Sequence, residues 1–116
     1  MKTTKKDFEL FVKECEYWVN RFKLDDWQID YFHNKHEPNN CIAKVNTTLT
    51  AKSASVTLNS DLADDINVDI KATAKHEIIH ILLGELSELG WSRFTTRDEM
   101  RTVEESLTRK LENIIN

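Results

Sequence analysis

Apolar residues recur every three or four positions between Thr4 and Phe22 and predict one amphipathic helix there. This spacing gathers side chains on a single face of a helix, which then packs on a core. The apolar stripe consists of Phe8, Phe11, Val12, Cys15, Trp18, Val19 and Phe22. Thr4, followed three residues later by Asp7, has the pattern of an N-terminal cap. We therefore expect an N-terminal helix that builds the core.

After this helix the pattern changes to alternation, which is typical of strands with one buried face. Apolar and polar residues alternate in Trp27 to Phe32 and again in Ala54 to Asn59, and Cys41 to Val45 is a third short strand. A loop that contains a proline, His33 to Asn40, follows the first strand. The threonine-rich stretch Asn46 to Lys52 separates the other two strands, which predicts a hairpin.

Apolar residues nearly surround the segment from Val68 to Leu83, as expected for a helix that is buried on most sides. Thr73, His76, Glu77 and His80 form a polar wedge in this segment. Buried polar groups need partners, and a metal ion is one such partner. Asn67 is a candidate N-cap, and Gly84 and Gly90 mark the expected helix end and the loop after it.

A capping-box pattern at Thr96 to Glu99 opens a last helix, which we expect to run to about Ile115. The predicted order is therefore one helix, three strands and two helices, an α+β domain with a small three-stranded sheet. At 116 residues the chain has room for one core, so we expect a single domain over residues 1–116.

Charge and composition narrow the possible classes of function. The net charge of −4 argues against a general nucleic-acid or anionic-membrane binder. No signal peptide or transmembrane segment is visible. Cys15 and Cys41 lack the spacing of a metal or redox motif, so we expect free thiols in a reducing cytoplasm. The sequence leaves the oligomeric state open.

His76, Glu77 and His80 form the pattern H-E-x-x-H. Residues four apart lie on the same face of a helix, so both imidazoles can bind one metal ion. Glu77 is rotated by about 100° from His76, near enough to hold a water on that metal and take its proton. Two imidazoles and a carboxylate suit Zn²⁺ best, and zinc lowers the pKa of such a water to about 7. The pattern predicts a zinc peptidase with Glu77 as general base.

A catalytic zinc needs a third protein ligand. No histidine follows His80, so downstream carboxylates are the candidates. The expected inward stripe of the last helix is Met100, Val103, Leu107, Leu111 and Ile114. Glu104 falls on the flank of this stripe, whereas Glu105 lies toward solvent. We favour Glu104 as the third ligand and keep Glu105 as the alternative, because a small error in helix phase would exchange them.

His33 and His36 follow the first strand. They are either exposed loop histidines or cleft residues that donate to the reaction oxyanion or to substrate. Tyr31, Arg93 and Arg97 are comparable candidates for that role, and the sequence does not rank them.

The chain resembles a minimal zincin metallopeptidase of the gluzincin type, in which two motif histidines and a downstream glutamate bind zinc. It is similar in layout to small metallopeptidase-like proteins of bacteriophages and prophages and to SprT-like and ImmA-like proteins. The resemblance rests on H-E-x-x-H, on the strands that contain residues 27–30 and 54–59, and on the Glu104-Glu105 pair. It implies a zincin-like fold and hydrolysis of a peptide or protein substrate.

The resemblance also implies that a small twisted sheet backs the motif helix and that the strand Ala54 to Asn59 binds an extended peptide antiparallel. Larger gluzincins carry an aspartate four residues after the glutamate ligand, where it supports a zinc histidine. Thr108 and Arg109 stand at those positions here. The support must therefore come from elsewhere, such as Asp69 or a backbone carbonyl.

Two other functions fit the same residues. One is a non-catalytic binding module, a phage or prophage accessory protein that keeps the zincin fold and its metal. The other is a plain helix-and-sheet domain in which the motif is accidental. In the second case the polar groups of a buried helix would lack partners.

Overall fold

The computed structural model describes residues 1–91 and 97–114, and its elements follow the predicted order. They are α1 (Lys5–Arg21), β1 (Gln28–Asn34), β2 (Ala43–Thr48), β3 (Ser53–Asn59), α2 (Ile70–Trp91) and α3 (Arg97–Ile114). The protein is an α+β domain with three helices and a small mixed sheet, as the sequence predicts. Among the described helices, none has the length and apolar character needed to cross a membrane.

The N-terminal helix α1 begins at the predicted cap. The Asp7 backbone N–H donates to the Thr4 hydroxyl at 3.1 Å, and the Thr4 backbone N–H donates to the Asp7 carboxylate at 2.8 Å. This reciprocal arrangement satisfies two donors that a helix start leaves without partners. Phe11, Cys15 and Trp18 are buried, which confirms the predicted stripe. Cys15 and Cys41 are free thiols, also as predicted.

The sheet has the strand order β1-β3-β2, so β3 is central. β1 runs parallel to β3, and β2 runs antiparallel to it through the predicted hairpin turn. Val56 of β3 pairs with Tyr31 on one side and with Val45 on the other. Because both edges of β3 are paired, an added peptide strand has no place beside it. The open edges belong to β1 and β2, which corrects the expectation that the strand 54–59 offers an edge.

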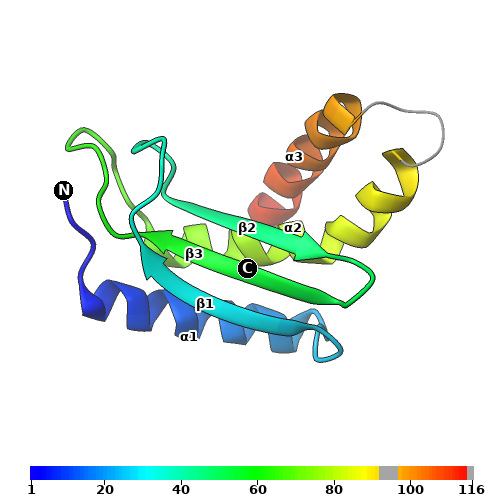
Figure 1. Cartoon of the computed structure of the whole chain (residues 1–116), viewed down its shortest axis with the longest axis horizontal. Helices are drawn as coiled ribbons and strands as arrows, with labels where there is room; N and C mark the ends of the chain where they lie inside the picture. The colour runs from blue at the N-terminus through cyan, green and yellow to red at the C-terminus, as the bar shows by residue number, and fades with distance from the viewer. Residues whose placement is uncertain (92–96, 115–116) are drawn as a thin grey trace.

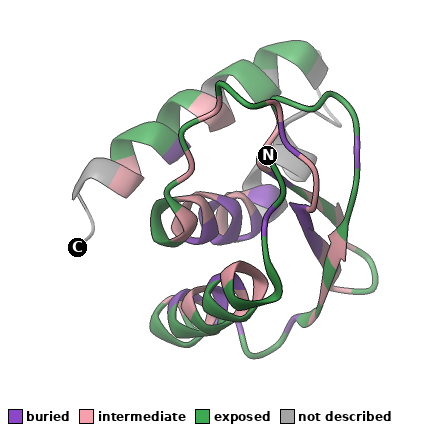
Figure 2. Ribbon diagram, turned by 90° about the vertical axis from the view of Figure 1, so that its left-hand side faces the viewer, coloured by how far each residue is buried: buried purple, intermediate pink, exposed green. Residues whose placement is uncertain are grey.

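Helices α1 and α2 cover the same face of the sheet, and α3 packs on α2 on the side away from α1 (Figures 1 and 2). The core lies between the sheet and the two inner helices, and its centre is fully buried: Phe11, Cys15, Val56, Leu58, Ala74 and Ile78. β2 is the edge strand on the side where α3 lies (Figure 1). The sheet therefore presents one free edge toward the α2–α3 pair.

The motif helix α2 differs from the prediction at both ends. It begins at Ile70, and Asp69 rather than Asn67 provides the cap, since its Oδ1 accepts from the Ala72 N–H at 3.1 Å. The helix continues through Gly84 and Gly90 to Trp91, where a helix end and a loop were expected. Gly84 is buried against β2. Packing of this face outweighs the low helix propensity of glycine.

The phase of α3 also differs from the prediction. Leu107, which was expected in the inward stripe, is 38% exposed, while Thr108 is fully buried and donates its hydroxyl to the Glu104 carbonyl at 2.8 Å. The reason is that α3 packs on the polar wedge of α2, so carboxylates rather than leucine face inward. Thr96 of the predicted capping box, and the side chains of residues 100, 103 and 114, lie outside what the structure describes.

Candidate metal centre

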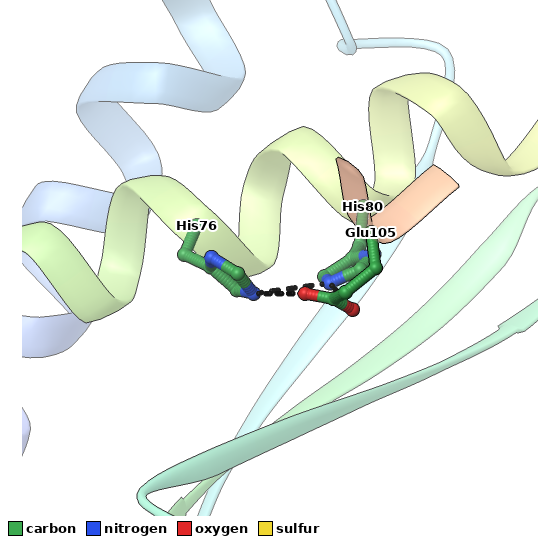
Figure 3. Close-up of side chains that lie close together, drawn as sticks. All are labelled: His76, His80 and Glu105. Atoms are coloured by element: carbon green, nitrogen blue, oxygen red, sulfur yellow. Dashed lines mark hydrogen bonds and ion pairs between the residues drawn. The ribbon is translucent and has the colours of Figure 1, made fainter. Parts of the chain in front are cut away.

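His76 and His80 project from successive turns of α2 toward Glu105 of α3 (Figure 3). The Nε2 atom of His76 lies 3.0 Å from one Glu105 carboxylate oxygen, and the Nε2 atom of His80 lies 3.2 Å from the other. The two Nε2 atoms are 3.1 Å apart. Among the described residues, these three form the one group whose ligand atoms are close enough to share a metal ion.

Each imidazole is held from behind by a second carboxylate. The Nδ1 atom of His76 lies 2.8 Å from Glu112, and the Nδ1 atom of His80 lies 3.3 Å from Glu104. When each Nδ1 donates its proton to the carboxylate behind it, each Nε2 is left with a lone pair directed at the centre of the group. Metal-binding histidines in proteins are held by this same arrangement of outer partners.

In this tautomer four acceptor atoms meet at the centre of the group: two imidazole nitrogens and two carboxylate oxygens. They repel one another unless a positive charge lies among them. Ligand atoms bound tetrahedrally to zinc at its usual distances are about 3.3 Å apart. The observed separations of 3.0, 3.1 and 3.2 Å are close to that value. The donor set and its spacing thus fit a zinc ion.

Protons are the other positive charge available to this group. Burial lowers the pKa of His80, but the hydrogen bond to Glu104 and the negative charges of Glu105 and Glu77 outweigh burial and raise that pKa. The carboxylates thus favour a positive charge at the site, whether a proton or a metal ion supplies it. A divalent cation satisfies all four acceptors at once, whereas one added proton satisfies a single pair.

Of the two glutamates that the sequence offers as third ligand, the structure brings Glu105 into the group. Glu104, the favoured candidate, lies on the far side of the His80 ring at Nδ1. Glu105 was expected to face solvent, yet its side chain is 39% exposed and reaches both histidines. The phase of α3, shifted by about one residue, explains the exchange, because Thr108 rather than Leu107 marks its buried face.

Glu77 lies beside the two histidines in a different environment. Its side chain is 7% exposed, and burial raises its pKa, while the charges of His80 and His76 act in the opposite direction. None of the hydrogen bonds between described residues includes its carboxylate. A buried carboxylate needs a partner, and water is the partner that this site leaves for it.

β2 packs against the motif helix α2. Burial raises the pKa of the Cys41 thiol, which lies just before β2, and the charge of Glu77 raises it further. At the other end of the strand, a Cβ at Gly84 would lie 3.8 Å from the Thr47 hydroxyl. The end of β2 therefore lies beside Gly84 of α2.

The structure does not bring His33 or Tyr31 into the histidine–glutamate group. The His33 ring stacks on Phe8, with ring centroids 5.0 Å apart, and its Nε2 is 2.7 Å from the Thr3 hydroxyl. Burial raises the pKa of Tyr31, which packs against the core beside Cys15. The side chains of Arg93 and Arg97 lie outside the described part of the chain.

His36 is buried but lies on the other face of the sheet. Its backbone is held by the Asn59 side chain, which donates to the His36 carbonyl at 3.0 Å. Burial lowers the pKa of its ring, and the charge of nearby Lys44 lowers it further. Lys44 pairs with Thr57, whose side chain alternates with that of Val56 and so points away from the helices. Neither ring nitrogen has a hydrogen-bond partner among the described residues.

Glu112 is one of the downstream carboxylates that the sequence offers as ligands, but its role as the outer partner of His76 was not predicted. Its signal was present in the spacing, because Glu112 lies eight residues after Glu104 and seven after Glu105, two helical turns along the same face. Lys75 helps to hold this part of α3, since its ammonium donates to the Glu112 carbonyl at 2.6 Å. Asp69, suggested for this supporting role, caps α2 instead.

Comparisons of the chain with protein-family models, with curated proteins and with solved structures found no match. The likeness to zincins therefore rests on the motif and on the geometry of the residues around it.

Proposed function

We propose that this protein is a zinc-dependent metallopeptidase of zincin type. One observation carries the proposal. The motif histidines and Glu105 present four acceptor atoms to a common centre, and carboxylates at both Nδ1 atoms fix the imidazoles in the ligating tautomer. In this proposal His76, His80 and Glu105 hold the metal. Glu104, the ligand first favoured, supports His80 instead.

Zinc, when bound at such a site, polarises a carbonyl group and lowers the pKa of water. Glu77 acts as the general base that removes a proton from the attacking water, and it then delivers that proton to the leaving amine. Its burial supports this role, because a raised carboxylate pKa brings proton release closer to neutral pH. Its lack of a hydrogen bond to the described residues leaves the carboxylate available to water.

The substrate in this proposal is a peptide or protein segment that lies along the free edge of β2. An extended chain can pair with an exposed edge strand, and β2 is an edge strand that packs against α2. β2 thus replaces the central strand β3 in the role that the resemblance implied. We place the protein in the cytoplasm, where its two free thiols stay reduced.

The first test is the zinc content of protein purified without a metal-binding tag. We expect about one zinc per chain in the wild type and little in His80→Ala, which removes one ligand. Lys13→Ala, an exposed change on α1, serves as the matched control and should retain the metal. Absence of zinc from the wild type, even after incubation with zinc salt, would refute the metal centre.

The second test is the Glu77→Gln variant in a peptide hydrolysis assay. We expect it to keep zinc and to lose at least about a hundredfold of the hydrolytic rate, the range typical of a lost general base. Hydrolysis at the wild-type rate would show that Glu77 is not the base. Zinc binding with no hydrolysis by the wild type would favour the alternative, a non-catalytic binding module that retains the metal.

A further inference from the structure

An open surface cavity of about 630 Å³ lies along α3. Its described lining consists of Arg101, Thr102, Glu105, Ser106, Arg109 and Lys110. Glu105 belongs both to the metal centre and to this lining, so the cavity shares one residue with the metal centre.

Arg109 faces this cavity without the helical ion pairs that its sequence offers. Its acidic neighbours on the helix are Glu105, four residues before it, and Glu112, three residues after it. Both carboxylates turn to His76 instead, at 3.0 and 2.8 Å. Within the described residues, no ion pair joins either glutamate to Arg109. The metal centre thus engages the carboxylates that would otherwise neutralise this guanidinium.

Lys110 is the second cation of the cavity, and the sequence gives it no acidic neighbour on the helix. The positions three and four residues away hold Ser106, Leu107, Asn113 and Ile114. Lys110 and Arg109 are both exposed. Apart from Glu105, whose carboxylate turns to the histidines, no residue of the described lining is acidic. Outside Glu105, the described lining is therefore cationic or neutral.

We propose that this cavity binds a carboxylate of the peptide substrate through Arg109 and Lys110. The proposal rests on the peptidase function proposed above and names its substrate class. Arg109 lies one turn beyond Glu105, a rise of about 6 Å, and an extended peptide rises about 3.3 Å per residue. The carboxylate is thus within about two residues of the bond held at the histidines. It comes from an acidic side chain or from the C-terminus of the substrate.

The test uses two sets of alanine-rich octapeptides and the zinc-loaded Glu77→Gln variant, which binds them without turnover. In the first set a single Glu is moved along a capped peptide and compared with Gln at the same position. In the second set a free C-terminus is compared with an amide. Calorimetric titration measures each affinity. We expect the carboxylate member of at least one pair to bind about fivefold more tightly, as for an exposed charge pair.

The variants decide whether Arg109 is responsible. Adding Arg109→Gln should abolish the preference, whereas adding Arg21→Gln, the same change at an exposed position on α1, should preserve it. Equal binding of both members of every pair overturns the proposal, as does failure of every carboxylate peptide to bind at millimolar concentration. The proposal is also overturned if Arg109→Gln weakens the binding of both peptides of a pair equally. The arginine would then only offset the charge of the nearby glutamates.

The outcome is separable from that of the peptidase proposal. Hydrolysis of the same peptides by zinc-loaded wild-type protein is measured independently. A carboxylate preference without any hydrolysis would refute the peptidase and keep the binding site. Hydrolysis without a carboxylate preference would keep the peptidase and refute the binding site. The two peptide sets also separate an acidic side chain from a C-terminal carboxylate as the group that binds.

Discussion

Removal of the carboxylate behind His76 should weaken zinc binding although that carboxylate does not touch the metal. Glu112 accepts from the Nδ1–H of His76 at 2.8 Å and is 23% exposed. Its charge raises the basicity of the imidazole and fixes the ring with Nε2 toward the site. The Glu112→Ala variant loses both effects, whereas Glu112→Gln keeps an acceptor and loses only the charge.

The size of the effect follows from the geometry. Loss of such an outer partner typically costs 10- to 100-fold in metal affinity, which corresponds to about 1.4–2.7 kcal/mol. The short bond to Glu112 places Glu112→Ala in the upper part of this range. Glu104 lies 3.3 Å from His80, near the long limit of a hydrogen bond, so Glu104→Ala should cost less than about tenfold. The expected order of zinc affinities is wild type, then Glu104→Ala, then Glu112→Ala.

Zinc affinity is measured by competition with a chromophoric chelator at fixed pH. Glu99→Ala, which removes an exposed carboxylate from the same helix, controls for the change in net charge and should have little effect. If Glu112→Ala bound zinc as tightly as the wild type, the Nδ1 contact would have no part in the site. If Glu104→Ala and Glu112→Ala weakened zinc binding equally, the hydrogen-bond distances of 3.3 and 2.8 Å would not predict the loss of zinc affinity.

Three further predictions concern the fold. Gly84→Ala should stabilise the protein by about 0.5–1 kcal/mol in urea unfolding, because alanine favours helix and the added Cβ meets Thr47 Oγ1 at an ordinary 3.8 Å. A destabilised variant would mean that the α2–β2 contact is tighter than described. Leu107→Gln should change the free energy of unfolding by no more than about 0.5 kcal/mol, since the side chain is 38% exposed. A loss of about 2 kcal/mol or more would place Leu107 in the core. Removal of zinc by a chelator should lower the Tm of the wild type by roughly 10 °C and leave His80→Ala unchanged, and equal shifts in the two proteins would show that the chelator acts elsewhere.

The parts of the fold that depend on local pattern were predictable from the sequence. The Thr4 cap, the α1 stripe and the β2–β3 hairpin each arise from residues close together in the chain. The strand order was not predictable, because the parallel pairing of β1 with β3 joins segments separated by the whole of β2. That pairing decides which strand has a free edge, and it moved the expected peptide-binding edge from β3 to β2.

In the candidate site, the motif residues were predictable and the third ligand was not. His76 and His80 share a face by helical geometry alone. The choice between Glu104 and Glu105 depended on the phase of α3, which was inferred from its apolar residues. The polar wedge of α2 instead draws carboxylates inward, so the hydrophobic pattern gave a phase that is wrong by about one residue. In α3, the interaction of carboxylates with the polar wedge of α2 outweighs burial of the apolar stripe.

The two helices that build the site are joined through polar groups, and this has a thermodynamic consequence. Glu104, Glu105 and Glu112 of α3 approach Glu77 and the histidines of α2, so four carboxylates gather where other helix pairs bury leucine. Without a cation, their mutual repulsion opposes the docking of α3; with one, the same charges draw the helices together. The attachment of the last helix and the occupancy of the metal site are then a single coupled equilibrium, and either can be used to measure the other.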